Sequence, residues 1–211
     1  VMYSVAIFPA MSRFFLASKS KLKFAYEKSF KYMLLFGLPM AIGIFIYANQ
    51  IISLVYGQDY MRSSLALRAL AAFVAFRSVN IISATSLSAM NRQGSVVLSQ
   101  GTAAFSNIAL NFILIPIFGI VGAGLATVIT DIMLFIFYIF LITRYKLTVK
   151  FTKISLKPVI ASIVMALFII NIENLLIGVV TGITTYSAAL LIIRAFDKDD
   201  ARLLNKIITN R

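Results

Sequence analysis

The chain has 211 residues, of which 61% are hydrophobic and 13% are charged, and its formal net charge is +13. Soluble domains contain roughly 45–50% apolar and about 25% charged residues, so this composition excludes an ordinary soluble domain and favours a protein covered by lipid. The sequence contains no Cys and no His. Disulfides, thiolate metal sites and the commonest general base are therefore excluded, and we expect no metal and no cofactor.

The N-terminal residues are apolar up to Arg13, but this run is too short to cross a bilayer. It also lacks the basic segment with which a signal peptide begins. Residues 1–17 are therefore predicted to be the end of a truncated transmembrane helix, which makes the chain a C-terminal fragment of a longer transporter.

Six longer apolar stretches follow, and each approaches the roughly 20 residues that a helix needs to cross a hydrocarbon core about 30 Å thick. The predicted fold class is all-α, a polytopic helical membrane protein. We predict membrane-spanning helices at 32–55, 65–89, 96–116, 121–143, 156–172 and 175–195, followed by a cytoplasmic tail at 196–211.

The Lys and Arg residues lie in alternate gaps between these stretches. The gaps 13–31, 90–95 and 144–157 and the end of the chain from Arg194 hold all but three of the 20 Lys and Arg residues. Because Lys and Arg resist translocation, these gaps and the C-terminus are predicted to be cytoplasmic. The same distribution accounts for the net charge, so no nucleic-acid partner is expected.

Two arginines lie inside the second predicted span, 65–89. Arg77 is near its middle, where a charge costs roughly 2.5–3.5 kcal/mol on insertion scales, so we expect Arg77 to face a watery cavity or a charged partner. Arg68 is nearer the outer end, where its side chain can reach the interface. At 100° per residue the two arginines point to opposite faces of the helix and should not form one clamp.

Asp131 is the acidic residue that lies well inside a predicted span, near the middle of 121–143. Three interpretations are open. Asp131 pairs with Arg77, which has a similar predicted depth, and the pair exchanges partners during transport; or the two make a static polar contact that aids packing; or Asp131 titrates as a proton or cation site.

The third predicted span carries Gln100, Asn107 and Asn111 on one helix face. Amide side chains in hydrocarbon need hydrogen-bond partners, so this face is predicted to point inward. We expect Gln100 to line a substrate cavity and Asn107 and Asn111 to have structural roles.

Pro39 lies inside the first predicted span, 32–55. Proline removes one helical hydrogen bond and bends the helix, so Pro39 is either a hinge or a fixed kink. Gly119, Gly122 and Gly124 follow the third span, where they predict a tight turn and a close approach of two helices.

Sequence templates for enzymes are missing. The chain contains no phosphate-binding GxxxxGK[ST] loop and no cluster of metal ligands, and without His it can form neither a Ser–His nor a Cys–His pair. We therefore expect no catalytic residue and no enzyme activity.

Five short segments occur in a distinctive order. They are FPAMSR at Phe8–Arg13, GLP at Gly37–Pro39, IISLVYGQDY at Ile51–Tyr60, SAMNRQG at Ser88–Gly94 and NIALNFILIPIFGIVGAGLAT at Asn107–Thr127. In order and spacing they resemble segments of polysaccharide flippases of the O-antigen type, within the multidrug/oligosaccharidyl-lipid/polysaccharide exporter superfamily.

The resemblance implies a fold of 12–14 helices, in which two lobes surround a cavity that opens to one side at a time. Residues 32–143 would hold four helices of the C-terminal lobe, and residues 156–195 two additional helices. The implied substrate is an oligosaccharide on a polyprenyl diphosphate, which is moved across the cytoplasmic membrane without ATP hydrolysis. Arg77 and Arg68 would then bind the diphosphate.

The implied partners are the lipid-linked oligosaccharide, membrane lipids, and the glycan polymerase and glycosyltransferases of the same process. Two other functions are compatible with the sequence. One is a cation-coupled multidrug exporter of the same fold, which would favour acidic and aromatic cavities. The other is a non-transporting membrane scaffold for glycan assembly, which would have no use for charges inside its spans.

Overall fold

The computed structural model describes residues 2–145, 147, 149 and 151–195, and these residues form helices joined by short connections. The elements are α1 (Met2–Ala17), α2 (Lys19–Ile46), α3 (Ala48–Tyr56), the 3₁₀ turn η1 (Gln58–Tyr60), α4 (Ser63–Ala89), α5 (Gln93–Phe118), α6 (Ile120–Arg144), α7 (Phe151–Ile169) and α8 (Leu175–Ile192). Within the described residues, six helices (α2 and α4 to α8) are long and apolar enough to cross a membrane. The predicted all-α, polytopic fold class is confirmed.

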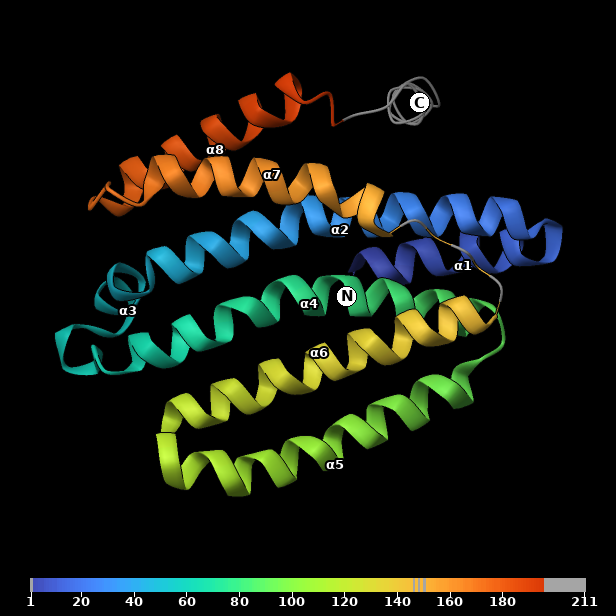
Figure 1. Cartoon of the computed structure of the whole chain (residues 1–211), viewed down its shortest axis with the longest axis horizontal. Coiled ribbons are helices and arrows are strands. Elements are labelled where there is room, and N and C mark those ends of the chain that lie inside the picture. The colour runs from blue at the N-terminus through green and yellow to red at the C-terminus, as the bar shows by residue number, and fades with distance from the viewer. Residues whose placement is uncertain (1, 146, 148, 150, 196–211) are drawn as a thin grey trace.

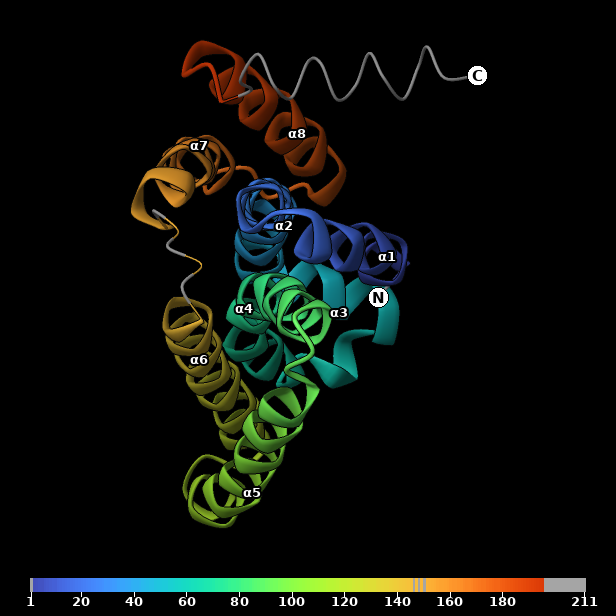
Figure 2. The same ribbon diagram turned by 90° about the vertical axis from the view of Figure 1, so that its right-hand side faces the viewer.

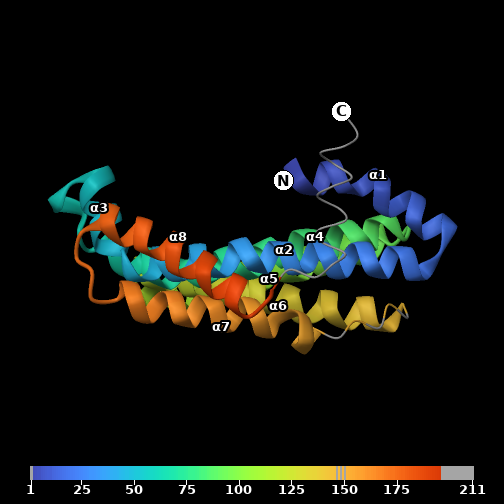
Figure 3. The same ribbon diagram turned by 90° about the horizontal axis from the view of Figure 1, so that it is seen from above.

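Long helices that follow one another in the chain run in opposite directions along the bundle (Figure 1). Helix α4 packs between α2 and α6, and α5 packs mainly against α6 at one side of the bundle. Seen from the end, α7 and α8 lie beyond α2, while α1 lies beside α2 and α4 (Figure 2). The view from above shows that α8 crosses α2 obliquely (Figure 3).

The two ends of the bundle differ in charge. One end holds the start of α2, the α4–α5 connection and the end of α6 (Figure 1). The first lysines of α2 (Lys19, Lys21 and Lys23), together with Arg92 and Arg144, belong to these segments. We call this end the basic end. The other end holds α3, η1 and the turns between α5 and α6 and between α7 and α8.

Helix α2 begins at Lys19, well before the predicted span at 32. The basic segment that the sequence predicts as a gap is therefore mostly helical. The Ser18 hydroxyl caps the helix by accepting the Ser20 N–H at 3.2 Å. Leu22, Tyr26 and Phe30 then recur at helical spacing and are buried against the core. Burial of these side chains stabilises the helix through the lysine-rich stretch before residue 32. The charge of this stretch is the reason that the sequence does not predict it as part of a membrane span.

The first predicted span, 32–55, is wrong in one further respect, because the helix breaks at Tyr47. The backbone of Tyr47 is non-helical, with φ −94° and ψ 17°, and α3 starts as a separate helix at Ala48. The Tyr47 hydroxyl donates to the carbonyl of Ile169, the last residue of α7, at 3.0 Å. The same carbonyl accepts the N–H of Ile172 at 3.1 Å, so Tyr47 adds a second hydrogen bond to the end of α7 across the bundle.

The remaining boundaries differ from the predicted ones by a few residues. Helix α5 continues past Pro116 to Phe118, and α7 starts at Phe151 rather than at 156. The cytoplasmic tail predicted at 196–211 lies outside the described residues, so its prediction is untested.

The glycine between α5 and α6 and the two in the first turns of α6 act as predicted. Gly119 has φ 58° and ends α5 in the left-handed region that glycine tolerates best. A Cβ atom at Gly122 would overlap the backbone carbonyl of Leu114 on α5, and one at Gly124 would lie 3.3 Å from the carbonyl oxygen of Ala66 on α4. Small residues at these positions therefore allow α6 to pack closely on both neighbours.

Gly122→Ala tests this close approach. The added methyl group would overlap backbone atoms that cannot rotate away, so we expect a loss of about 1–3 kcal/mol in stability, seen as a lower thermal unfolding midpoint of the purified chain in detergent. Gly101→Ala on α5 is the matched control, because no atom lies within 4 Å of a Cβ built there. Equal midpoints for the two variants would contradict the packing argument.

Candidate functional site

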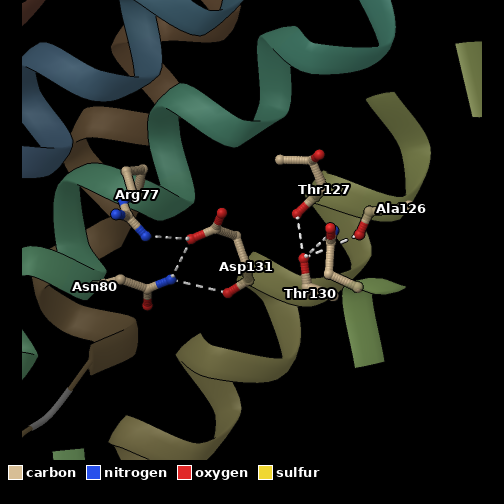
Figure 4. Close-up of polar contacts among 7 residues, drawn as sticks. Arg77, Asn80, Ala126, Thr127, Thr130 and Asp131 are labelled. Atoms are coloured by element: carbon tan, nitrogen blue, oxygen red, sulfur yellow. Dashed lines mark hydrogen bonds and ion pairs between the residues drawn. The ribbon is translucent and has the colours of Figure 1, made fainter. Parts of the chain in front are cut away.

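Helices α4 and α6 bring three polar side chains together (Figure 4). Nη1 of Arg77 lies 3.7 Å from Oδ1 of Asp131. The Asn80 amide, on the same side of α4, donates to the Asp131 backbone oxygen at 2.9 Å and to its Oδ1 at 3.1 Å. Arg77 and Asp131 are therefore in contact, and Asn80 holds the carboxylate in place.

The two charges of this pair have different environments. The side chain of Asp131 is 6% exposed and that of Arg77 is 51% exposed. A half-exposed ion pair contributes at most about 1 kcal/mol in water, whereas a buried carboxylate needs hydrogen-bond donors from the protein. Asn80 is such a donor. The half-exposed Arg77 guanidinium also lies 5.9 Å from the centre of the Phe73 ring.

Amide and hydroxyl groups form a second set of contacts, between α5 and the residue of α6 that precedes Asp131. Asn107 donates to the Thr130 hydroxyl, next to Asp131, at 3.2 Å, and Asn111 donates to Oδ1 of Asn107 at 2.9 Å. Asn107 thus links α5 to α6. Gln100 is exposed and lies near the hydroxyl of the buried Tyr138 on α6. Among the described residues, none makes a hydrogen bond to that hydroxyl.

Arg68 is not part of this cluster. It is half-buried, nine residues before Arg77 on α4, and its Nε is buried without a hydrogen-bond partner among the described residues. The structure brings Arg77, Asp131, Gln100 and Asn107 toward one region and leaves Arg68 apart from them.

Pro39 has a specific partner for the hydrogen bond that it removes. A residue at position 39 would normally donate its N–H to the carbonyl of Leu35 in α2, and proline has no N–H. The Tyr186 hydroxyl on α8 donates to this same Leu35 carbonyl at 2.8 Å. The gap that Pro39 leaves in α2 is therefore filled from a neighbouring helix.

An apolar groove runs along α2 and α8 beside Pro39, with a volume of about 1110 Å³. This exceeds the roughly 300–1,000 Å³ of ordinary small-molecule sites. Its lining includes Phe36, Met40, Ile44, Val179, Ile183 and Leu191, and none of the described residues that line it is charged. The groove therefore suits a long apolar ligand.

Two residues of the site were missed by the sequence reasoning. Asn80 lies three residues after Arg77 and so shares its helix face, a signal that could have identified it. Tyr186 gives no such signal, because its role depends on how α8 crosses α2. Within the described residues there is no group of three or more His, Cys, Asp or Glu side chains that could hold a metal ion.

The pairing of Tyr186 with the proline gap predicts energetic coupling. Tyr186→Phe leaves the Leu35 carbonyl without its donor and should lower stability by about 1–3 kcal/mol. In a Pro39→Ala background the new backbone N–H at position 39 can bond that carbonyl, so the same substitution should cost less. Thermal unfolding of the four proteins in detergent measures the coupling. An equal effect of Tyr186→Phe in both backgrounds would rule out the proposed compensation.

Comparison with known proteins is consistent with this architecture. A solved structure, Lipid II flippase MurJ in its inward closed conformation, superposes with a TM-score of 0.79 at 21% identity, over 90% of this chain and 43% of that one. At this level of identity the likeness shows a shared fold.

Two sequence relatives match a shorter part. The probable low-salt glycan biosynthesis flippase Agl15 of Haloferax volcanii is 32% identical over 127 residues, which are 59% of this chain and 26% of that protein. The uncharacterized membrane protein MJ1068 of Methanocaldococcus jannaschii is 29% identical over 126 residues, 60% of this chain and 25% of that protein. The matched part thus spans about a quarter of the length of these relatives.

The family described as "Lipid II flippase MurJ" matches residues 1–194, which is nearly the whole chain. The flippase resemblance of the five sequence segments agrees with this match. The chain belongs to the MurJ flippase family of multi-pass membrane proteins.

Proposed function

We propose that this chain acts in flipping a polyprenyl-diphosphate-linked oligosaccharide across the cell membrane by alternating access, for polysaccharide export. Membership of the MurJ family supports a lipid-linked saccharide as the substrate. The name of the Haloferax volcanii relative, a probable glycan biosynthesis flippase, points to the same class. Alternating access requires a ligand that binds the two facing states with different affinity.

The observation that carries this proposal is the apolar groove between α2 and α8. A polyprenyl chain is long, flexible and uncharged, and it must stay out of water while its headgroup crosses the membrane. A groove of about 1110 Å³ with uncharged walls matches these properties. Burial of the prenyl chain would contribute roughly 25 cal/mol per Å² of apolar surface.

Arg77 is our candidate for binding the diphosphate, and Arg68 and Gln100 are further candidates. Half of the Arg77 side chain is accessible although the residue lies in the middle of α4. When a diphosphate binds Arg77, the contact with Asp131 would be exchanged for the ligand, and Asp131 would keep its bonds from Asn80. Asp131 thus serves as the ion-pair partner, Asn107 and Asn111 as structural links, and Pro39 as the hinge of α2.

We place the basic end of the bundle, and with it the C-terminus, on the cytoplasmic side, because Lys and Arg resist translocation. The opposite end, with α3 and η1, then faces away from the cytoplasm. The glycan polymerase and glycosyltransferases that make and use the lipid-linked oligosaccharide are the expected protein partners.

Blocking the groove tests the proposed function. Ser187 is an exposed residue of α8 that lines the groove, so Ser187→Trp should fill part of it and lower flipping of a polyprenyl-diphosphate-linked oligosaccharide in proteoliposomes by about tenfold or more, which corresponds to about 1.4 kcal/mol. Ala188→Trp is the control, because the neighbouring residue is exposed outside the groove lining. Similar flipping rates in both variants would contradict the proposal.

The Arg77–Asp131 pair is tested in the same assay. If the two side chains act as one unit, Arg77→Ala, Asp131→Asn and the double variant should all flip substrate at similarly low rates, about tenfold or more below wild type. Arg62→Ala, an exposed arginine at the end opposite the basic end, controls for the loss of a positive charge. Losses that simply add in the double variant would exclude a functional pair.

A further inference from the structure

A second cavity lies near the basic end, between α2 and α7, and it differs in character from the apolar groove. Its volume is about 350 Å³. Three residues of α2 spaced four apart, Lys23, Glu27 and Lys31, form one wall, and Lys153 and Lys157 of α7 form the other. Four lysines and one glutamate therefore face one small space, which we call the lysine pocket.

Among the described residues that line this pocket, positive charges outnumber negative ones. The carboxylate is that of Glu27, whose Oε1 lies 3.9 Å from Nζ of Lys23, and the two side chains are 29% and 39% exposed. Partly exposed ion pairs of this kind contribute little to the stability of a fold, so Glu27 holds Lys23 only weakly. Lys31 is 7% exposed and has interactions of its own, so the ligand-binding capacity of the pocket rests on Lys23, Lys153 and Lys157.

The start of α7 adds to the positive potential. Lys153 and Lys157 occupy the first two turns of α7, and Lys23 lies near the start of α2. Helix N-termini carry partial positive charge and favour anions. Neither α2 nor α7 has an acidic residue in its first turn. An anion in the pocket would therefore be stabilised by the lysines and by the N-terminus of α7 together.

Lys157 is already oriented toward the pocket. Its ammonium donates to the carbonyl of Arg194, just after α8, at 2.7 Å. An ammonium has three hydrogens, so two others can still bind an acceptor. Ala195, the next residue, lines the same pocket, so the start of α7 and the residues just after α8 both border it.

The surface beside the pocket indicates what kind of anion would bind. On α7 the face of Lys153 and Lys157 continues into an exposed apolar stripe of Leu156, Ile160, Ile163 and Leu167. These side chains project from a helix that is long and apolar enough to span the membrane. An anion with an attached hydrocarbon chain can occupy both surfaces, whereas a soluble anion would use the lysines alone.

We propose that the lysine pocket binds the phosphate-bearing headgroup of an anionic membrane lipid, whose acyl chain lies along the exposed apolar stripe of α7. Basic pockets between membrane helices are a recognised form of such sites. This site is separate from the groove and from Arg77, so it does not depend on the proposed transport. It would anchor α7 and α2 to the leaflet at the basic end.

Native mass spectrometry of the purified full chain in neutral detergent tests the site, with phosphatidylglycerol as the probe and phosphatidylcholine as the zwitterionic reference. Lys153→Gln with Lys157→Gln should weaken phosphatidylglycerol binding about 25-fold, at roughly fivefold for each lysine removed. Lys19→Gln with Lys21→Gln removes the same charge from exposed positions of α2 outside the pocket and should change binding little. Lys153→Gln alone keeps the Lys157–Arg194 contact and should weaken binding about fivefold.

Three results would overturn the proposal. The first is an equal loss of binding in the two double variants, which would indicate attraction by net charge alone. The second is displacement of phosphatidylglycerol by sodium diphosphate at equal concentration, which would assign the pocket to a soluble phosphate. The third is lipid binding that appears only after Asp197, Asp199 and Asp200 are replaced by Asn, which would assign the pocket to the carboxylates that follow Ala195 in the sequence.

Discussion

Polar groups inside a hydrocarbon layer must find their hydrogen-bond partners within the protein, because no water is there to replace them. The long-range contacts of this chain follow from that constraint. Tyr186 donates to the Leu35 carbonyl, Tyr47 to the Ile169 carbonyl and Asn80 to the Asp131 carbonyl. Each donor is a side chain of one helix or its end, and each acceptor is the backbone of another. The Leu35 carbonyl has lost its helical donor to Pro39, and the Ile169 carbonyl lies at the end of α7, where it also accepts the Ile172 N–H.

These contacts also determine how α7 and α8 attach to the rest of the bundle. The two tyrosine bonds tie both helices to α2 and to its end at Tyr47, and apolar side chains fill the space between them. The apolar groove lies along the same helices, so an apolar ligand in it would contact Pro39 and Tyr186 directly. Such a ligand would contact α2 at the point where Pro39 removes a helical hydrogen bond and Tyr186 replaces it.

Charge is placed in two distinct environments. In the middle of α4 and α6, one buried carboxylate is held by Asn80 and approached by a half-exposed guanidinium, so the local charges nearly cancel. At the lysine pocket, the described lining residues include four lysines and one glutamate beside the start of α7, so their summed charge is positive. The first arrangement keeps a charged pair stable within a membrane span, and the second attracts phosphate groups at the membrane surface.

The amino-acid sequence was enough to predict the fold class, the number of spans and the placement of Arg77 and Asp131 inside two spans, because apolar length and the insertion cost of charge act locally along the chain. It also determined the tight turn at Gly119. It did not determine that α2 starts at Lys19 or breaks at Tyr47, since buried partners on other helices decide both. Only the tertiary structure revealed the Tyr186–Leu35 bond, the groove and the lysine pocket. Each is formed by residues far apart in sequence, and no periodicity within one helix records how that helix crosses its neighbours.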